Sequence, residues 1–199
     1  MNRRLILTSI ASFAAAPVLV PSALAQDAPA QLSAARQTHI TDTLAVGSLS
    51  LMLSRIAEPR VYAPPLKQFA GFEIAEQETI ASILGAIRNG GRPSGAVPSP
   101  SDSDVMQTLD AAGRAEVEKL RQMAAGRTFD REYLRAQIEG HNKLLDIQEA
   151  YLRAPDDLDE TNVAKLARGM IKEHLTLLGD IQSISLENAE RMRGQSKAH

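Results

Sequence analysis

The sequence predicts an all-α fold, an antiparallel four-helix bundle with a long crossover between its second and third helices. Three observations predict it. Helix-forming residues dominate the 199-residue chain, aromatic residues make up only 4% of it, and β-branched residues do not alternate in short runs. Four long segments carry apolar residues at spacings near three and four. Proline, glycine or asparagine stands between these segments, where helices have to end.

The chain begins with the features of a signal peptide. A pair of arginines and an apolar stretch precede an Ala-x-Ala pattern that ends at Ala25. We expect cleavage between Ala25 and Gln26, so that residues 1–25 are removed and residues 26–199 form the helical bundle domain. This predicts a periplasmic or secreted location, and the arginine pair leaves general secretion and twin-arginine export both open.

Composition excludes several classes of protein. The chain has no cysteine, which rules out disulfides, thiolate metal sites and a lipidated cysteine. The formal net charge is −2 and no basic patch stands out, so we expect no nucleic-acid partner. No second apolar stretch of about 20 residues follows the leader, so we expect no membrane span after cleavage. An unknown protein partner or self-association stays open.

The first expected helix runs from about Ala30 to Ala57, and Pro59 stops it. The second begins at Pro64, because a proline in the first turn of a helix costs no hydrogen bond. It ends at Asn89, where two glycines follow. The short connection between these two helices predicts that they are antiparallel neighbours.

Residues 89–104 are rich in glycine, proline and serine, and a shorter extra helix is expected from about 105 to 125. The third bundle helix is expected to open at Asp130 as N-cap and to end near Arg153. Two hairpins joined by one long crossover are the ferritin-like arrangement.

The fourth helix is expected to open near Asp157, with Glu160 three residues later as the partner in a capping box. Its apolar residues follow one another at alternating spacings of three and four, which predicts a stripe that faces the core. The predicted stripe is Val163, Leu166, Met170, His174, Leu177, Ile181 and Ile184.

Four residues are candidate metal ligands: His141, His174, Glu73 and Glu76. Both histidines lie in apolar stripes, about 14 residues before and 19 after the turn at Pro155, so they are expected to face one another. Carboxylates and imidazoles together suit iron, manganese or zinc. No Glu-x-x-His occurs in the chain, which argues against a di-iron centre.

A purely structural interpretation of the same residues also stays open. Each histidine then is a neutral core residue whose pKa burial holds below about 6.5, and the two glutamates lie on a solvated face. The sequence also lacks a phosphate-binding glycine loop, a nucleophile elbow and a His-Glu-x-x-His motif.

The residues Thr128-Phe129-Asp130-Arg131-Glu132-Tyr133, with Gln137, His141 and His174-Leu175 downstream, resemble a known family. It is the exported bacterial domain-of-unknown-function family with a ferritin-like fold, whose members often carry an outer-membrane-protein label. The resemblance covers about His39 to Ile184 and implies a bundle with a crossover, export, and no established activity or cofactor.

This chain departs from the family pattern at two places. The family commonly has a histidine after an acid in the second helix, where this chain has Gln77 after Glu76. A glutamate usual on the first helix is replaced near Ser50 or Leu51. We therefore expect a non-enzymatic exported bundle without cofactor, in a structural, stress-related or partner-binding role. Metal binding or metal oxidation is the alternative.

Overall fold

The computed structural model describes residues 32–91 and 94–196, with side chains as far as Leu186. The predicted signal peptide and its Ala25–Gln26 cleavage site lie outside these residues. Within them the chain forms six helices and no strand, so the all-α prediction is confirmed. The helices are α1 (Ala34–Ala57), α2 (Pro64–Arg88), α3 (Asp102–Thr108), α4 (Ala111–Gln122), α5 (Arg127–Leu152) and α6 (Leu158–Ser196).

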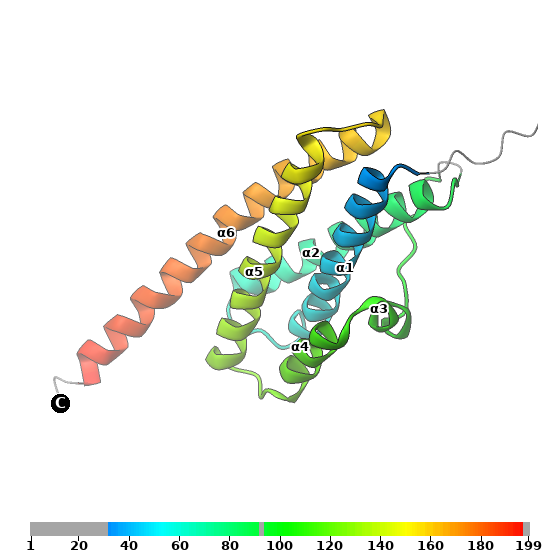
Figure 1. Cartoon of the computed structure of the whole chain (residues 1–199). Coiled ribbons are helices and arrows are strands. Elements are labelled where there is room, and N and C mark those ends of the chain that lie inside the picture. The colour runs from blue at the N-terminus through cyan, green and yellow to red at the C-terminus, as the bar shows by residue number, and fades with distance from the viewer. Residues whose placement is uncertain (1–31, 92–93, 197–199) are drawn as a thin grey trace, which may run out of the picture. The chain divides into compact units, whose positions relative to one another are not determined.

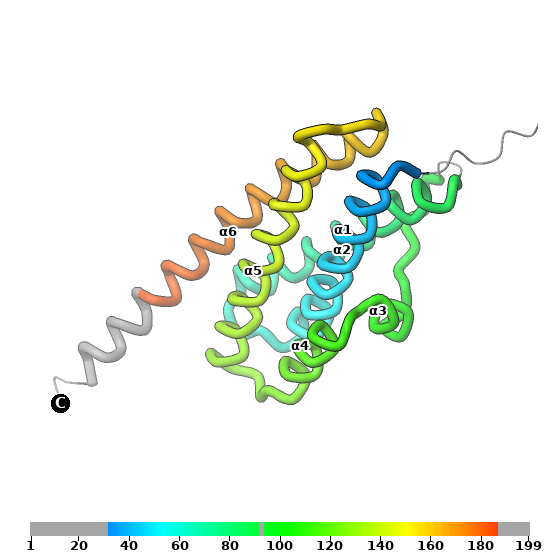
Figure 2. The backbone as a smooth tube through the Cα atoms, in the orientation of Figure 1, coloured from blue at the N-terminus to red at the C-terminus, as the bar shows by residue number. Residues whose placement is uncertain are grey.

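The four long helices contact one another in pairs, as Figures 1 and 2 show. α1 packs against α2 and α5, α5 packs against α6, and a sparser interface joins α2 to α6. Cross-helix contacts give the directions: Ser54 of α1 meets Tyr133 early in α5, and His39 early in α1 meets Gln148 late in α5. α1 and α5 are therefore antiparallel neighbours.

The crossover between α2 and α5 differs from the single extra helix that was expected over residues 105–125. It forms two helices, because Leu109 has an extended backbone and the Asp110 carboxylate accepts a hydrogen bond from the Gly113 amide at 2.7 Å, which starts α4. α3 and α4 both lie against α1 and bury Val105 and Val117 in the core.

α5 starts three residues before the predicted N-cap. Its cap is Gly126, whose φ of 142° favours glycine, and Asp130 lies within the first turn. The Asp130 carboxylate instead accepts hydrogen bonds from the backbone amides of Tyr62 and Ala63, and the shortest joins the Ala63 amide to Oδ2 at 2.9 Å. This side chain ties the α1–α2 connection to α5.

The predicted core stripe of α6 is wrong by one position along much of the helix. His174 and Ile181 are buried as expected, but Leu166, Leu177 and Ile184 are exposed. Small side chains take part in the core stripe because they let α6 approach its neighbours closely. The residues that are buried on α6 after its first turn are Ala164, Ala167, Ile171, His174, Leu178 and Ile181.

Among the described residues, α1 is long and apolar enough to cross a membrane, judged by length and composition alone. A core helix and a signal sequence meet the same criterion. In this structure half of that apolar window is buried, and His39, Ser50 and Ser54 of α1 contact polar side chains of other helices. α1 therefore serves as a core helix here, and the location of the protein stays a prediction.

Candidate metal centre

Three long helices bring one carboxylate and two imidazoles together in the core. Glu73 comes from α2, His141 from α5 and His174 from α6. His141 Nε2 lies 3.2 Å from Glu73 Oε2, and His174 Nδ1 lies 3.3 Å from the same oxygen. The two ring nitrogens are 3.1 Å apart. The three atoms form a nearly equilateral triangle, and we name these three residues the Glu73 cluster.

The neighbours of the two imidazoles determine which nitrogen of each neutral ring carries the proton. His141 Nδ1 donates to the backbone carbonyl of Gln137 at 2.8 Å, so Nε2 of the neutral ring has no proton. His174 Nε2 faces Glu76 Oε2 at 3.1 Å, which favours the proton on that nitrogen and leaves a lone pair on Nδ1. In the neutral rings, the two nitrogens with these lone pairs face each other and lie 3.2 and 3.3 Å from Glu73 Oε2.

The Glu73 carboxylate has two different sides. Its Oε1 accepts from the amide of Gln77 at 2.9 Å and lies 2.5 Å from the hydroxyl of Ser50. Its Oε2 is buried and has no partner in hydrogen-bond geometry. Buried polar atoms in native proteins nearly always have a partner, so an orphan here points to a ligand.

Tight packing holds the cluster in place. The ring of Phe69 lies against both imidazoles, with centroid distances of 5.7 Å to His141 and 5.1 Å to His174. The Gln77 amide fits against α1 because position 47 is glycine: a Cβ there would overlap Gln77 Oε1. A hydrogen-bonded series of Ser50, Gln137, Ser54 and Tyr133 continues into the core on the Oε1 side of Glu73.

The charges of the cluster follow from these contacts. Burial alone raises the pKa of Glu73, but the two imidazoles outweigh it and hold that pKa far below its usual range. Burial alone lowers the pKa of His174, but the carboxylates of Glu73 and Glu76 outweigh it and raise the pKa to about 9. The sequence-based expectation of two neutral imidazoles is therefore wrong for His174 in the metal-free protein.

The triangle has the dimensions of a coordination site. Ligand atoms about 2.0–2.1 Å from a metal lie about 3.3–3.4 Å apart at tetrahedral angles and about 2.8–3.0 Å apart at right angles. The observed edges of 3.1, 3.2 and 3.3 Å fall in this interval. Two imidazoles and a carboxylate suit zinc, iron or manganese, so the residues present fit one such ion.

A family model described as a domain of unknown function (DUF4142) matches residues 21–181. The chain belongs to the DUF4142 family. This confirms the domain-of-unknown-function part of the resemblance noted in the sequence. No curated protein and no solved structure matches the chain.

Both departures of this DUF4142 domain from the expected pattern lie beside Glu73. Ser50 and Gln77 are the two side chains around Glu73 Oε1. Because both are neutral, Glu73 is the one carboxylate within the triangle, and the donor set fits one ion instead of two. The fourth predicted residue, Glu76, does not join the triangle and contacts the outer nitrogen of His174.

Sequence reasoning missed the residues that position Glu73. Ser50, Gln77 and Gln137 are buried polar side chains on the core faces of their helices. A polar residue in the apolar stripe of a helix is the sequence signal that could have found them. Gln137, for example, lies one turn before His141 on the same helix.

A second buried carboxylate–imidazole pair joins α1 to α6 in this DUF4142 domain. His39 Nδ1 lies 2.7 Å from Glu160 Oε1, and Arg36 Nε donates to Glu160 Oε2 at 2.8 Å. His39 Nε2 lies 2.8 Å from Gln148 Oε1. We name these four residues the Glu160 cluster. Glu160 was predicted to complete a capping box, but both of its oxygens bind α1 while Asp157 alone caps α6 through the Glu160 amide.

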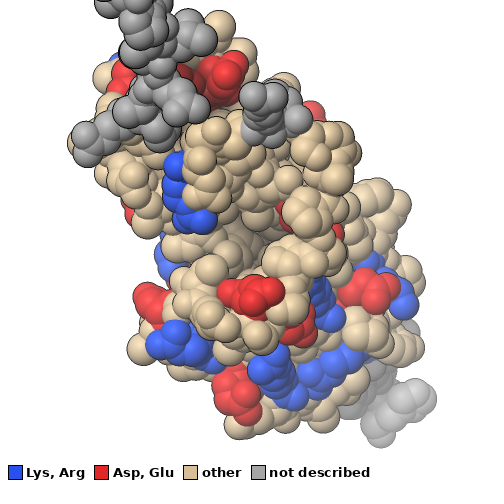
Figure 3. Space-filling view, turned by 90° about the vertical axis from the view of Figure 1, so that its right-hand side faces the viewer, with Lys and Arg blue, Asp and Glu red and all other residues tan. Residues whose placement is uncertain are grey.

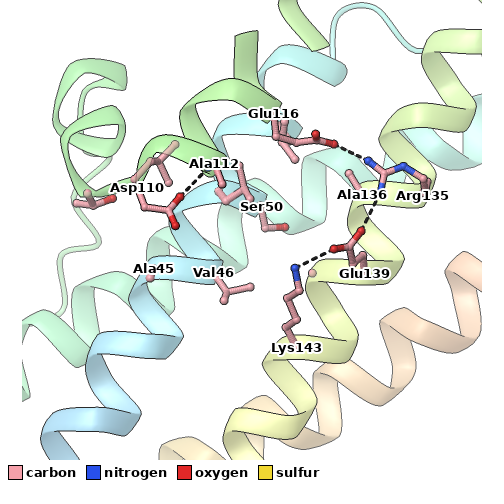
Figure 4. Close-up of a pocket in the computed structure, with 16 residues that line it drawn as sticks. Ala45, Val46, Ser50, Asp110, Ala112, Glu116, Arg135, Ala136, Glu139 and Lys143 are labelled. Atoms are coloured by element: carbon pink, nitrogen blue, oxygen red, sulfur yellow. Dashed lines mark hydrogen bonds and ion pairs between the residues drawn. The ribbon is translucent and has the colours of Figure 1, made fainter. Parts of the chain in front are cut away.

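A cavity of about 500 Å³ lies between α1, α4 and α5 (Figure 4). Its rim carries alternating charges: Arg135 pairs with Glu116 and Glu139, and Glu139 pairs with Lys143. Ser50, which contacts Glu73 Oε1, lines this cavity. None of the three triangle residues lines it. Acidic and basic side chains also alternate on the face shown in Figure 3.

Proposed function

We propose that this protein binds one divalent transition-metal ion through Glu73 Oε2, His141 Nε2 and His174 Nδ1. One observation carries the proposal: three lone-pair atoms from three helices converge in the core, and the carboxylate oxygen among them has no hydrogen-bond partner. A proton on His174 Nδ1 can form a hydrogen bond to His141 Nε2 or to Glu73 Oε2, but not a good one to both. A metal ion can bind all three atoms at once.

The surroundings of the three ligands support metal binding. Metal-binding histidines usually direct their other ring nitrogen to a carbonyl or carboxylate, which orients the ring and raises its basicity. His141 does this with Gln137 and His174 with Glu76. The ion we propose is zinc, iron(II) or manganese(II), and we assign it no reaction.

We propose a ferritin-like four-helix bundle as the scaffold, with α1, α2, α5 and α6 as the bundle and α3–α4 in the crossover. The pairwise packing of the long helices supports this arrangement. We also propose export to the periplasm, on the basis of the leader pattern that ends at Ala25. Metal binding is preferred to a purely structural role because Glu73 Oε2 is buried without a partner in hydrogen-bond geometry.

Elemental analysis and thermal melts test the proposal. Protein freed of metal with a chelator is titrated with Zn²⁺, Fe²⁺ or Mn²⁺, and one equivalent of at least one ion should bind. At a hundredfold excess over Kd we expect the melting temperature to rise by roughly 5–10 °C. His174→Leu should abolish the rise.

His39→Gln is the matched control, because His39 is a buried histidine that pairs with a carboxylate outside the Glu73 cluster. It should keep the metal-dependent rise even if the protein melts earlier. Absence of a rise with every ion, or an equal rise in His174→Leu, would contradict metal binding at this site.

A further inference from the structure

We propose that metal ions reach the buried site between α2 and α6, and that Glu76 is the residue that captures them from solvent. The inference rests on the proposed function and adds the route of entry and the residue that controls it. Glu76 is then an entry residue, separate from the three ligands that hold the ion.

Exposure increases in one direction away from the triangle. Glu73 is 0% exposed and the side chain of His141 is 1% exposed. The side chain of His174 is 10% exposed, and that of Glu76 is 29% exposed. The side chains that surround Glu73 elsewhere, Ser50, Gln77 and Phe69, are buried. The exposed fraction of the side chain therefore increases from Glu73 through His174 to Glu76, which reaches solvent.

The chemistry of Glu76 suits capture of a cation. One of its oxygens, Oε2, is buried and lies 3.1 Å from His174 Nε2, outside hydrogen-bond geometry. The carboxylate thus spans the boundary between solvent and the core, with one edge directed at a ligand residue. A carboxylate at the mouth of a partly dehydrated path raises the local concentration of cations and their rate of association.

The packing around Glu76 is sparse. The α2–α6 interface is sparser than the α1–α2, α1–α5 and α5–α6 interfaces. Phe72 lies one turn before Glu76 on α2, Leu177 lies one turn after His174 on α6, and both are exposed. Small separations of these two helices do not require the main core to unfold.

The cavity between α1, α4 and α5 offers a poorer route. An ion that entered there would meet Ser50 and then Glu73 Oε1, which already accepts from Gln77. The oxygen that lacks a partner, Oε2, lies on the other side of the carboxylate.

Stopped-flow mixing with Co²⁺ tests the route, because the absorption of this ion reports its coordination. Glu76→Gln keeps the size of the side chain and an oxygen that faces His174, but removes the charge. We expect the association rate constant to fall about tenfold and the dissociation rate constant to fall with it, so that Kd changes little. Glu173→Gln is the matched control, since Glu173 is an exposed acid next to His174 in sequence and should leave the rate within about twofold.

The outcomes separate the two proposals. If the wild type does not bind Co²⁺ at equilibrium, the proposed function fails and the entry route fails with it. If the wild type binds, an unchanged association rate in Glu76→Gln overturns the route, even if faster dissociation shows that Glu76 supports His174. Equal slowing by Glu173→Gln also overturns it, because general electrostatic attraction then explains the effect. Ala136→Leu, which fills the cavity, should not slow association, and slowing would redirect entry to the cavity.

Discussion

The Glu73 cluster and the Glu160 cluster contain the same kinds of residue but differ in how completely their polar atoms are matched. Each buries a glutamate that contacts histidine between helices distant in sequence. Glu160 has one donor for each oxygen, Arg36 and His39, and His39 directs its second nitrogen at Gln148. Gln148 in turn donates to Thr43, which fixes its amide so that its oxygen faces the imidazole. Both oxygens of Glu160 therefore have a hydrogen-bond partner.

The Glu73 cluster has no permanent cation equivalent to Arg36, because His174 is charged only while both of its ring nitrogens hold a proton. Two histidines and a glutamate converge, and Glu73 Oε2 has no hydrogen-bond partner. A buried polar atom without a partner costs free energy, so a stable fold either supplies one or reserves the position for a ligand. The number of donors, and not the residue types, therefore distinguishes a structural ion pair from a candidate metal site.

The largest expected effect is on metal affinity. Glu73→Gln removes the anionic ligand and should weaken Zn²⁺ binding by roughly a thousandfold, about 4 kcal/mol. Glu160→Gln removes the same charge from the other cluster and should leave the affinity within about threefold. Competition titration with a chelator of known affinity measures both. Similar losses in the two variants would mean that the clusters do not differ as we infer.

The Glu160 cluster should matter for the stability of the metal-free protein, although it should not matter for metal affinity. Glu160→Ala leaves His39 and Arg36 without their buried partner and should lower the free energy of unfolding by about 3–4 kcal/mol. Urea unfolding in the presence of chelator measures this loss. A cost below about 1 kcal/mol would show that solvent reaches the Glu160 cluster.

The pH dependence of stability should reveal the proton held by the metal-free Glu73 cluster. Because the folded pKa of His174 is raised to about 9, its contribution is complete below pH 6.5 and is lost as pH rises through 9. The free energy of unfolding should fall by an amount on the order of 2 kcal/mol between pH 6 and 9.5. His174→Leu should flatten this change in urea titrations with chelator. A stability that increases over this range would refute the charged state of His174.

The smallest expected effect tests the support of Glu73 from α1. Gly47→Ala places a methyl group against Gln77 Oε1, so the Gln77 amide must shift away from its bond to Glu73. Metal affinity should fall about tenfold, as is typical when the support of a ligand is lost. Gly169→Ala is the control, because nothing lies within 4 Å of its added Cβ. It should leave affinity unchanged and raise stability by up to about 1 kcal/mol.

The sequence predicted the helices well where turn residues decide their ends. Pro64 starts α2 and Asp157 caps α6, as expected from local chemistry. The positions of His141 and His174 relative to the turn also predicted that they meet. These inferences need only helix geometry and residues close in sequence.

What the sequence did not predict depends on how helices pack. The core stripe of α6 includes Ala164 and Ala167, which hydrophobicity ranks below the exposed Leu166. Glu160 looked like a capping residue because its partners, His39 and Arg36, lie more than 120 positions away. Gln77 and Ser50 looked like losses from a family pattern, and only the packed structure shows that both contact Glu73.

The three proposed ligands come from α2, α5 and α6, and two of them lie on either side of the sparse α2–α6 interface. An ion bound as proposed would fasten α2 to α6 across this interface. Amide hydrogens of α2 around Glu73 then exchange with solvent through local opening in the metal-free domain and only through global unfolding in the loaded one. Metal bound as proposed would therefore couple the local stability of α2 around Glu73 to that of α6.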